Sequence, residues 1–232
     1  MSGALATVYP TPLFGVAVTV IAYAISSAVH HRFRWMPTLV LTCGGLIALL
    51  LVCHIPNESY QAGGNIISFF LGPATIALGV PFYKHAKAFR AHAVPIVIAV
   101  VAGSASGILS AGGLVLLMHG SPVLLRSMLP KSVTTPISIE LSRQLGGVPE
   151  LTAVFTVLAG LLGSVIGPQL LRLCRIRGNI AIGLAMGTSS HGIGTARILR
   201  DSEFQGGASG LAMALAGIIT SLMIIPLQWL LR

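Results

Sequence analysis

Long apolar runs alternate with short polar clusters along this chain, and the pattern predicts membrane-spanning helices. The apolar runs cover residues 13–29, 37–55, 65–83, 94–118, 151–171 and 211–231. A helix needs roughly 20 apolar residues to cross the hydrocarbon core of a bilayer. The runs are continuous, whereas the strands of a membrane barrel would alternate apolar and polar positions. We therefore expect an all-α integral membrane protein.

Two further segments, residues 122–147 and 179–200, combine two short apolar halves with a polar centre. The first is interrupted at residues 130–136 and the second at residues 187–197. A half of about ten helical residues reaches roughly 15 Å, which is half of the bilayer core. Each segment is therefore either one broken span or a re-entrant hairpin. Two broken spans give eight crossings, and two hairpins that enter from opposite faces give six.

The breaks accompany an internal repeat. Triplets that end in Ala-Gly recur at an even interval, with their glycines at Gly103, Gly160 and Gly217. Each triplet lies in an apolar run that follows a break in a helix. The first break is at Pro73, because proline has no backbone N–H to donate to the helical ladder. We expect six to eight transmembrane helices with two or three discontinuous or re-entrant helices. We expect an N-terminal two-span segment (1–62) and a transport core (63–232) with breaks near 73, 135 and 191.

The composition agrees with a membrane protein. Hydrophobic residues make up 54% of the chain and charged residues 8%, against about 25% charged in ordinary soluble domains. The net charge of +9 does not indicate nucleic-acid binding, because the basic residues form short clusters between apolar runs, as cytoplasmic loops do. We expect a multi-pass membrane protein.

The second and third breaks are the candidate solute site, because interrupted helices at bilayer depth line cavities. A small anion held there would need hydrogen-bond donors and positive charge, which hydroxyls and helix N-termini supply. The residues that we predict to bind it are Thr134, Thr135, Ser138, Ser189, Ser190, His191 and Thr195. The plainer alternative is that these hydroxyls bond to their own helix backbone and that the histidine is a satisfied core residue.

Three ionisable residues are candidates for charge recognition or proton coupling: Glu140, His191 and Arg197. Histidine as a residue type titrates near neutral pH, so His191 could couple transport to a proton. Arg197 is either a counter-charge or a cytoplasmic anchor. Glu140 is the acid inside an apolar segment, and it either accepts a proton or pairs with Arg143 one turn later. The helix-breaking residues are Pro73, Pro136, Gly192 and Gly194.

Enzyme functions find no support in the sequence. The Gly-x-Ser-x-Gly motif is absent, the three cysteines have no paired spacing, and Gly192-Ile193-Gly194 lacks the rest of a dinucleotide fingerprint. We expect no enzymatic activity, no metal and no cofactor.

Four stretches resemble the LrgB/CidB family of bacterial membrane proteins, namely residues 71–78, 130–140, 151–155 and 187–197. The resemblance runs from about residue 55 to the end of the chain. It implies a multi-pass protein of the bacterial cytoplasmic (inner) membrane with a small LrgA/CidA-type membrane protein as partner, and it implies two functions. One is transport of small carboxylates such as pyruvate, glycolate or glycerate. The other is holin-like control of murein-hydrolase export and cell lysis (cytolysis).

The interrupted polar helices favour a transporter of small monocarboxylates, because a passive oligomeric pore does not require them. A holin-like pore or regulator is the alternative. The sequence leaves open which substrate and which coupling ion are used, and whether the protein forms a homo-oligomer.

Overall fold

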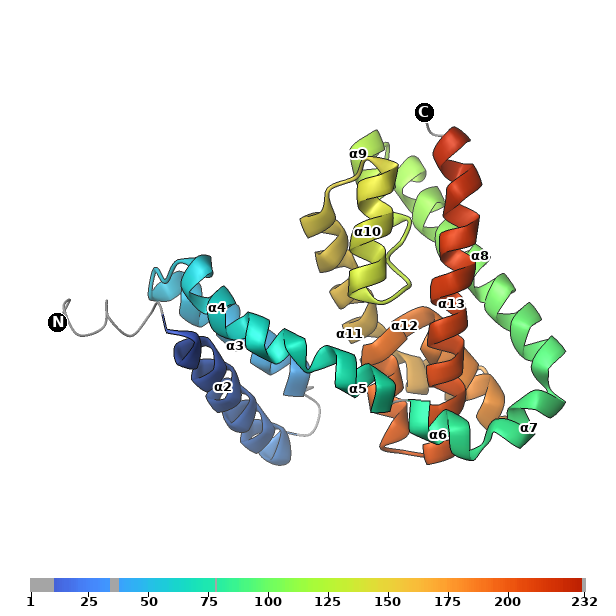
Figure 1. The fold of residues 1–232 in the computed structure, drawn as a ribbon, viewed down its shortest axis with the longest axis horizontal. Coiled ribbons are helices and arrows are strands. Elements are labelled where there is room, and N and C mark those ends of the chain that lie inside the picture. The colour runs from blue at the N-terminus through green and yellow to red at the C-terminus, as the bar shows by residue number, and fades with distance from the viewer. Residues whose placement is uncertain (1–10, 34–37, 78, 231–232) are drawn as a thin grey trace. The chain divides into compact units, whose positions relative to one another are not determined.

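The computed structural model describes residues 11–33, 38–77 and 79–230, and every regular element in these ranges is a helix (Figure 1). Five helical segments in the described residues are long and apolar enough to cross a membrane: Pro12–Arg32, Asn57–Lys84, Ala93–Leu117, Pro149–Leu173 and Glu203–Trp229. The prediction of an all-α, multi-pass membrane protein is confirmed. The chain forms two compact units, Met1–Ile76 and Ala77–Arg232. The functional division predicted at residue 62 stays a prediction.

The smaller unit contains α2 (Pro12–Arg32), α3 (Thr38–Val52), α4 (Asn57–Phe69) and most of α5 (Leu71–Ala77). Helices α2 and α4 approach closely at two glycines, since a Cβ added to Gly15 of α2 would lie 2.9 Å from the Cα of Gly63 of α4. Small residues let membrane helices approach this closely. The hydroxyls of Thr19 and Tyr60 lie 3.0 Å apart across the same interface.

The interruption predicted near Pro73 is present. Helix α4 ends at Phe69, and α5 begins at Leu71. Pro73 has no N–H to donate to the carbonyl four residues earlier, which is that of Phe69. The regular ladder therefore stops there and resumes when the N–H of Ala74 donates to the carbonyl of Phe70 (3.0 Å).

The larger unit is built on three long helices: α8 (Ala93–Leu117), α11 (Pro149–Leu173) and α13 (Glu203–Leu230). Two short helices, α6 (Gly79–Lys84) and α7 (Ala86–Ala91), precede them. The segments between the long helices are α9 (Pro122–Met128) with α10 (Thr135–Leu145), and α12 (Asn179–Leu199). One hydrophobic core joins α7, α8, α12 and α13 through Phe89, Val100, Leu184 and Ala212.

The segment with α9 and α10 is a re-entrant hairpin, which we call the first hairpin. Its two ends meet at Ser127, whose hydroxyl accepts the N–H of Val148 (2.8 Å) and whose carbonyl accepts the Thr152 hydroxyl (2.8 Å). Residues 129–134 therefore run back along α10 to its N-terminus at Thr135. Gly146, in the left-handed conformation (φ 74°), caps the other end of α10, as glycine commonly does.

Helix α12 is a second hairpin, and it reverses at His191. The backbone of His191 is non-helical, with φ 39° and ψ −134°. A Cβ added to Gly194 would lie 2.9 Å from the carbonyl oxygen of Met186, eight residues earlier. In a continuous helix these two residues would be separated by about 12 Å along the axis. The two halves of α12 therefore pack against each other.

The two hairpins enter from opposite ends of α13. The amide of Gln205, near the start of α13, donates to the side chain of Asn179 at the start of α12 (2.9 Å). The amide of Gln228, near the other end, donates to the carbonyl of Gln144 at the end of α10 (2.9 Å). Between these two contacts α13 rises by roughly 35 Å, at about 1.5 Å for each helical residue. This arrangement corresponds to the alternative of two re-entrant hairpins that enter from opposite faces.

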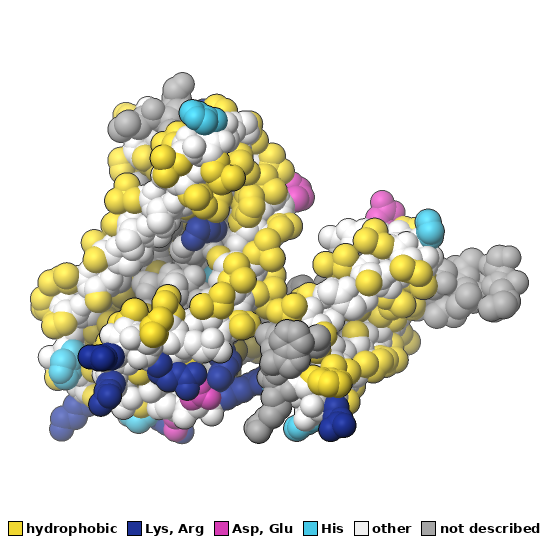
Figure 2. All heavy atoms as spheres, turned by 180° about the vertical axis from the view of Figure 1, so that it is seen from behind, with side chains coloured by type: hydrophobic (Ala, Val, Ile, Leu, Met, Phe, Trp, Pro, Cys, Tyr) yellow, Lys and Arg dark blue, Asp and Glu magenta, His cyan; other side chains and the backbone are white. Residues whose placement is uncertain are grey.

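Basic side chains gather at the end of the larger unit where α6, α7 and the ends of α12 lie (Figure 2). Lys84 of α6 forms an ion pair with Glu203 of α13 there (2.7 Å). The same end holds Lys87, Arg90, Arg172, Arg175, Arg177, Arg197 and Arg200. Cytoplasmic loops carry an excess of Lys and Arg. This excess predicts that this end faces the cytoplasm, in which case α12 enters from the cytoplasmic face and the first hairpin from the opposite face.

The repeated glycines lie where hairpins touch long helices. A Cβ on Gly103 of α8 would meet Thr188 of the second hairpin at 3.4 Å. One on Gly160 of α11 would meet His191 at 2.7 Å, and one on Gly217 of α13 would meet Ile137 of the first hairpin at 2.9 Å. The internal repeat thus marks hairpin contacts in each long helix.

Candidate functional site

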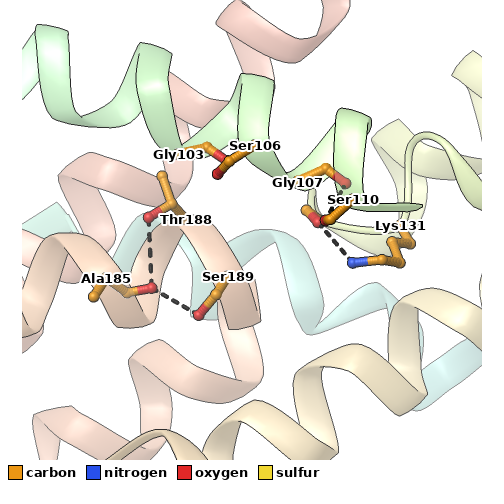
Figure 3. Close-up of a pocket in the computed structure, with 9 residues that line it drawn as sticks. Gly103, Ser106, Gly107, Ser110, Lys131, Ala185, Thr188 and Ser189 are labelled. Carbon is orange, nitrogen blue, oxygen red and sulfur yellow. Dashed lines mark hydrogen bonds between the residues drawn. The ribbon is translucent and has the colours of Figure 1, made fainter. Parts of the chain in front are cut away.

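A polar pocket of about 510 Å³ lies where the two hairpins face α8 (Figure 3). Helix α8 forms one wall, the 129–134 loop of the first hairpin forms the second, and the first half of α12 forms the third. The lining residues are Gly103, Ser106, Gly107, Ser110, Lys131, Ser132, Ala185, Thr188 and Ser189. Small and hydroxyl-bearing side chains dominate this list, with one cation, in a chain whose helices are otherwise strongly apolar.

Both hairpins contribute to the pocket, at positions that the internal repeat relates to each other. The interval that relates the repeated triplets also relates Lys131 to Thr188 and Ser132 to Ser189. The α8 wall consists of residues at positions 103, 106, 107 and 110, a spacing that places them on one face of a helix. The pocket is therefore lined by both hairpins together with α8, and neither hairpin forms it by itself.

Four hydroxyls in the pocket donate to their own helix. Ser106 donates to the carbonyl of Gly103 (2.9 Å), and Ser110 donates to that of Gly107 (3.1 Å). Thr188 donates to the carbonyl of Leu184, and Ser189 donates to that of Ala185 (2.7 Å). A hydroxyl has one donor and two acceptor lone pairs. These four side chains consequently present acceptors to a ligand.

The donors of the pocket lie on the 129–134 loop. The ammonium of Lys131 donates to the hydroxyl of Ser132 (3.3 Å), and the ammonium carries three donors in all. Leu129 and Val133, on either side, are buried in a hydrophobic cluster with Ile224 of α13, which anchors the loop. The loop therefore presents one cation and its donors to the pocket from a fixed backbone.

His191 lies at the reversal of α12 and is buried. Its Nε2–H donates to the carbonyl of Thr156 in α11 (2.9 Å), and the hydroxyl of Thr156 donates to Ser138 of the first hairpin (2.9 Å). Thr156 thus holds both hairpins on α11. The positive φ of His191 corresponds to the first central position of a type II′ turn, which glycine usually occupies. Such strain is found mainly at functional sites.

The other predicted binding residues fall into three groups. Ser189 lines the pocket. Ser138, Ser190 and Thr195 are fully buried with partners in the protein, since Ser138 bonds to Thr135 and Thr156, Ser190 to Ser189, and Thr195 to His191 and Ser209. Thr134 is the N-cap of α10, Thr135 is its first residue, and neither is among the pocket-lining residues. Solute binding by these side chains stays a prediction.

The predicted breaks take the following form. Pro136 lies in the first turn of α10, where a missing N–H costs no helical bond. Gly192 and Gly194 lie in the second half of α12, after the reversal at His191. Gly194 lets that half pack on the first one, because a Cβ there would lie 2.5 Å from the Cβ of Ser190.

Two of the predicted charge candidates lie at the exposed surface. Glu140 pairs with Arg143 (3.7 Å), which is one of the two alternatives drawn from the sequence. Arg197 pairs with Asp201 (2.8 Å) at the end of α12. Neither side chain lines the pocket.

Sequence reasoning missed Lys131, Ser132, Thr188, Ser106 and Ser110 as site residues. The sequence carries a signal for the α8 wall, namely small residues at positions 103, 106, 107 and 110 of an apolar run. Glycines in such a run are ordinarily interpreted as helix-packing residues. Gly112 does pack against Leu129, whereas Gly103 and Gly107 also line the pocket.

Comparison with known proteins gives one consistent family. The model of the LrgB-like family matches residues 19–230. The chain is 40% identical over 205 residues to YwbG of Bacillus subtilis (strain 168), covering 88% of this chain and 91% of that protein. It is 38% identical to YxaC of the same organism, covering 93% and 94%. It is 31% identical to "Antiholin-like protein LrgB" of Bacillus cereus (strain B4264), covering 94% and 95%. No solved structure matches.

Proposed function

The chain belongs to the LrgB-like family, and we propose that it transports small monocarboxylates through the pocket between α8, the 129–134 loop and α12. One observation carries the proposal: two hairpins that enter from opposite ends of α13 meet at one polar pocket. In secondary transporters, the substrate site commonly lies where interrupted helices of inverted repeats meet near the bilayer midplane.

The size and chemistry of the pocket support a small anion. Ligand sites typically enclose roughly 300–1,000 Å³, and this pocket of about 510 Å³ falls within that range. A carboxylate that leaves water needs a counter-charge and hydrogen-bond donors, because an unpaired ion is costly in a low-dielectric site. Lys131 and Ser132 supply both, and the surrounding hydroxyls can replace part of the hydration shell.

The repeat supports alternating access as the mechanism. Equivalent residues of the two hairpins face the same pocket, so a rocking motion of one repeat against the other would open it to one face and then to the other. A double variant, Ser132→Cys with Ser189→Cys, tests this motion. A cleavable bifunctional thiol cross-linker that joins the two cysteines should block uptake. The single variants, treated in the same way, measure how much of the block comes from the bulk of the linker in the pocket. Unimpaired uptake after complete cross-linking would rule out such motion.

A small LrgA/CidA-type membrane protein is the proposed partner, as the family resemblance implies. The second candidate function is the holin-like one, in which the chain regulates murein-hydrolase release. The name of the Bacillus cereus relative, "Antiholin-like protein LrgB", favours this alternative. The pocket favours transport, since a regulator of a pore needs no polar pocket at the junction of two hairpins.

Counterflow in proteoliposomes separates the two functions. Purified protein is reconstituted with and without the small partner, and uptake of labelled pyruvate, lactate, glycolate and glycerate is measured. A transporter gives saturable, stereoselective uptake that unlabelled substrate inhibits. A holin-like pore instead releases a trapped dye without saturation, and that result would contradict the proposal.

A pocket-filling variant ties the activity to this site. Ala185 lines the pocket, so Ala185→Phe should abolish uptake. The matched control is Leu109→Phe on α8, where the native side chain is exposed, and it should transport like the native protein. Equal uptake by the two variants would place the transport path elsewhere.

A further inference from the structure

Lys131 is the charged residue among the nine that line the pocket, and the other eight are glycine, alanine, serine and threonine. The lining therefore contains one positive charge and no carboxylate. Figure 3 shows the side chain of Lys131 reaching from the loop of the first hairpin toward α8, beside Ser110. The ammonium group thus faces the pocket and not the surface of the unit.

The backbone around Lys131 is fixed by its neighbours. Leu129, Pro130 and Val133 are buried, and the N–H of Lys131 donates to the carbonyl of Met128 (3.2 Å). Burial of the residues before and after it turns Lys131 and Ser132 to the opposite side of the loop, where the pocket lies. A cation held in this way is available for recognition without reordering of the chain.

The ion pairs found among the described residues use other cations. They join Lys84 to Glu203, Arg143 to Glu140 and Arg197 to Asp201. The polar contact of the Lys131 ammonium is with the neutral hydroxyl of Ser132. An ammonium carries three donors, so this contact leaves donors for a ligand. His191, which the sequence predicted as a charge carrier, donates to the Thr156 carbonyl instead.

We propose that Lys131 is the residue that recognises the charge of the transported anion, and that the carboxylate binds at Lys131 and Ser132. The inference rests on the proposed transport function and deepens it. The back-bonded hydroxyls of Ser106 and Ser189 present acceptors, and these face the uncharged part of the ligand. Because the lining holds one cation, the pocket selects a monocarboxylate over a dicarboxylate, whose second charge would have no partner there.

Charge removal and charge rescue test the assignment. Lys131→Met should raise the KM for lactate or glycolate at least tenfold, because a charge-assisted hydrogen bond is lost. Lys87→Met is the matched control, since Lys87 is exposed on α7, and its KM should stay within twofold of the native value. Native protein should discriminate against succinate, and Lys131→Met should discriminate less.

A cysteine at this position separates lost charge from altered folding. In a background with Cys43, Cys53 and Cys174 replaced by serine, Lys131→Cys is treated with 2-aminoethyl methanethiosulfonate, which attaches a cationic side chain, or with the methyl reagent, which attaches a neutral one. Only the cationic reagent should restore uptake. Equal effects of the two reagents, or a native KM in Lys131→Met, would overturn the role of Lys131. Neither result would contradict the transport function.

Ligand binding provides a readout that does not depend on transport. A saturating concentration of lactate should raise the melting temperature of the native protein in detergent and leave that of Lys131→Met unchanged. If lactate stabilises the native protein but no uptake is measured, the transport function is contradicted and the proposed binding site still stands. Equal stabilisation of both proteins would contradict the role of Lys131.

Discussion

The contact between Gly160 of α11 and the reversal of the second hairpin gives the sharpest prediction on stability. A methyl group added at Gly160 would lie 2.7 Å from Cε1 and 2.8 Å from Nε2 of His191, and 2.9 Å from Cδ1 of Ile193. Non-bonded carbon atoms prefer a separation of about 3.5–4.0 Å. The imidazole ring in Gly160→Ala would therefore have to move by roughly 1 Å to restore that separation, and it is confined because His191 is buried.

The expected cost follows from three contributions. Overpacking of a filled site costs about 1–3 kcal/mol. Displacement of the ring weakens the hydrogen bond to the Thr156 carbonyl (2.9 Å), and such a bond contributes about 1 kcal/mol. Replacement of glycine by alanine inside a helix returns about 1 kcal/mol. We therefore expect Gly160→Ala to reduce the free energy of unfolding by about 1–3 kcal/mol.

Thermal unfolding of the purified variants in one detergent measures this cost. Gly113→Ala in α8 is the matched control, because a Cβ at that position would meet nothing within 4 Å, and it should be neutral or stabilising. Gly103→Ala should fall between the two, since its Cβ would lie 3.4 Å from Thr188. If Gly160→Ala melts at the same temperature as Gly113→Ala, the second hairpin does not dock on α11 as described.

Three further predictions concern the contacts around the hairpins. Thr156→Val should lose about 1 kcal/mol of stability in a melting experiment, because the hydroxyl that donates to Ser138 is removed, whereas Thr156→Ser should stay close to the native protein. His191→Gly should melt above His191→Ala, by about 1 kcal/mol in stability, because both lose the ring but only glycine relieves the positive φ; the opposite order would show that the backbone at this residue is not strained. Glu140→Gln should leave uptake and its pH dependence unchanged, because the carboxylate pairs with Arg143 at the exposed surface; a shifted pH profile would assign it a role in proton coupling.

The positions of the helix interruptions could be predicted from the sequence, because proline and glycine have local and well-understood effects on a helix. Pro73 and Pro136 each lie within three residues of the start of a new helix. The choice between a broken span and a hairpin could not be made, since half-length helices fit both. That choice depends on distant contacts, such as those of Gln144 with Gln228 and of Asn179 with Gln205.

The pocket lies partly in the two interrupted segments that the sequence singled out and partly on α8, and Ser189 is the predicted binding residue that lines it. Which residues near a reversal face a cavity depends on the turn at His191, and the sequence does not specify the direction of that turn. Lys131 gives no sign of its role in the sequence, because a lysine beside a proline resembles an ordinary membrane-flanking cation. Only the packing of Leu129 and Val133 against Ile224 reveals that this loop is internal.

The central claim is that the two hairpins enter the membrane from opposite faces. The most direct test is to measure from which side of the membrane single cysteines react with an impermeant maleimide. Single cysteines are placed at His119, before the first hairpin, and at Gln144, at its end, and the natural Cys174 reports on the start of the second hairpin; each variant lacks the other natural cysteines. The account predicts that positions 119 and 144 react from the external face and that Cys174 reacts from the cytoplasmic face. Reaction of positions 119 and 144 from opposite faces would make the first hairpin a spanning segment and would contradict the account.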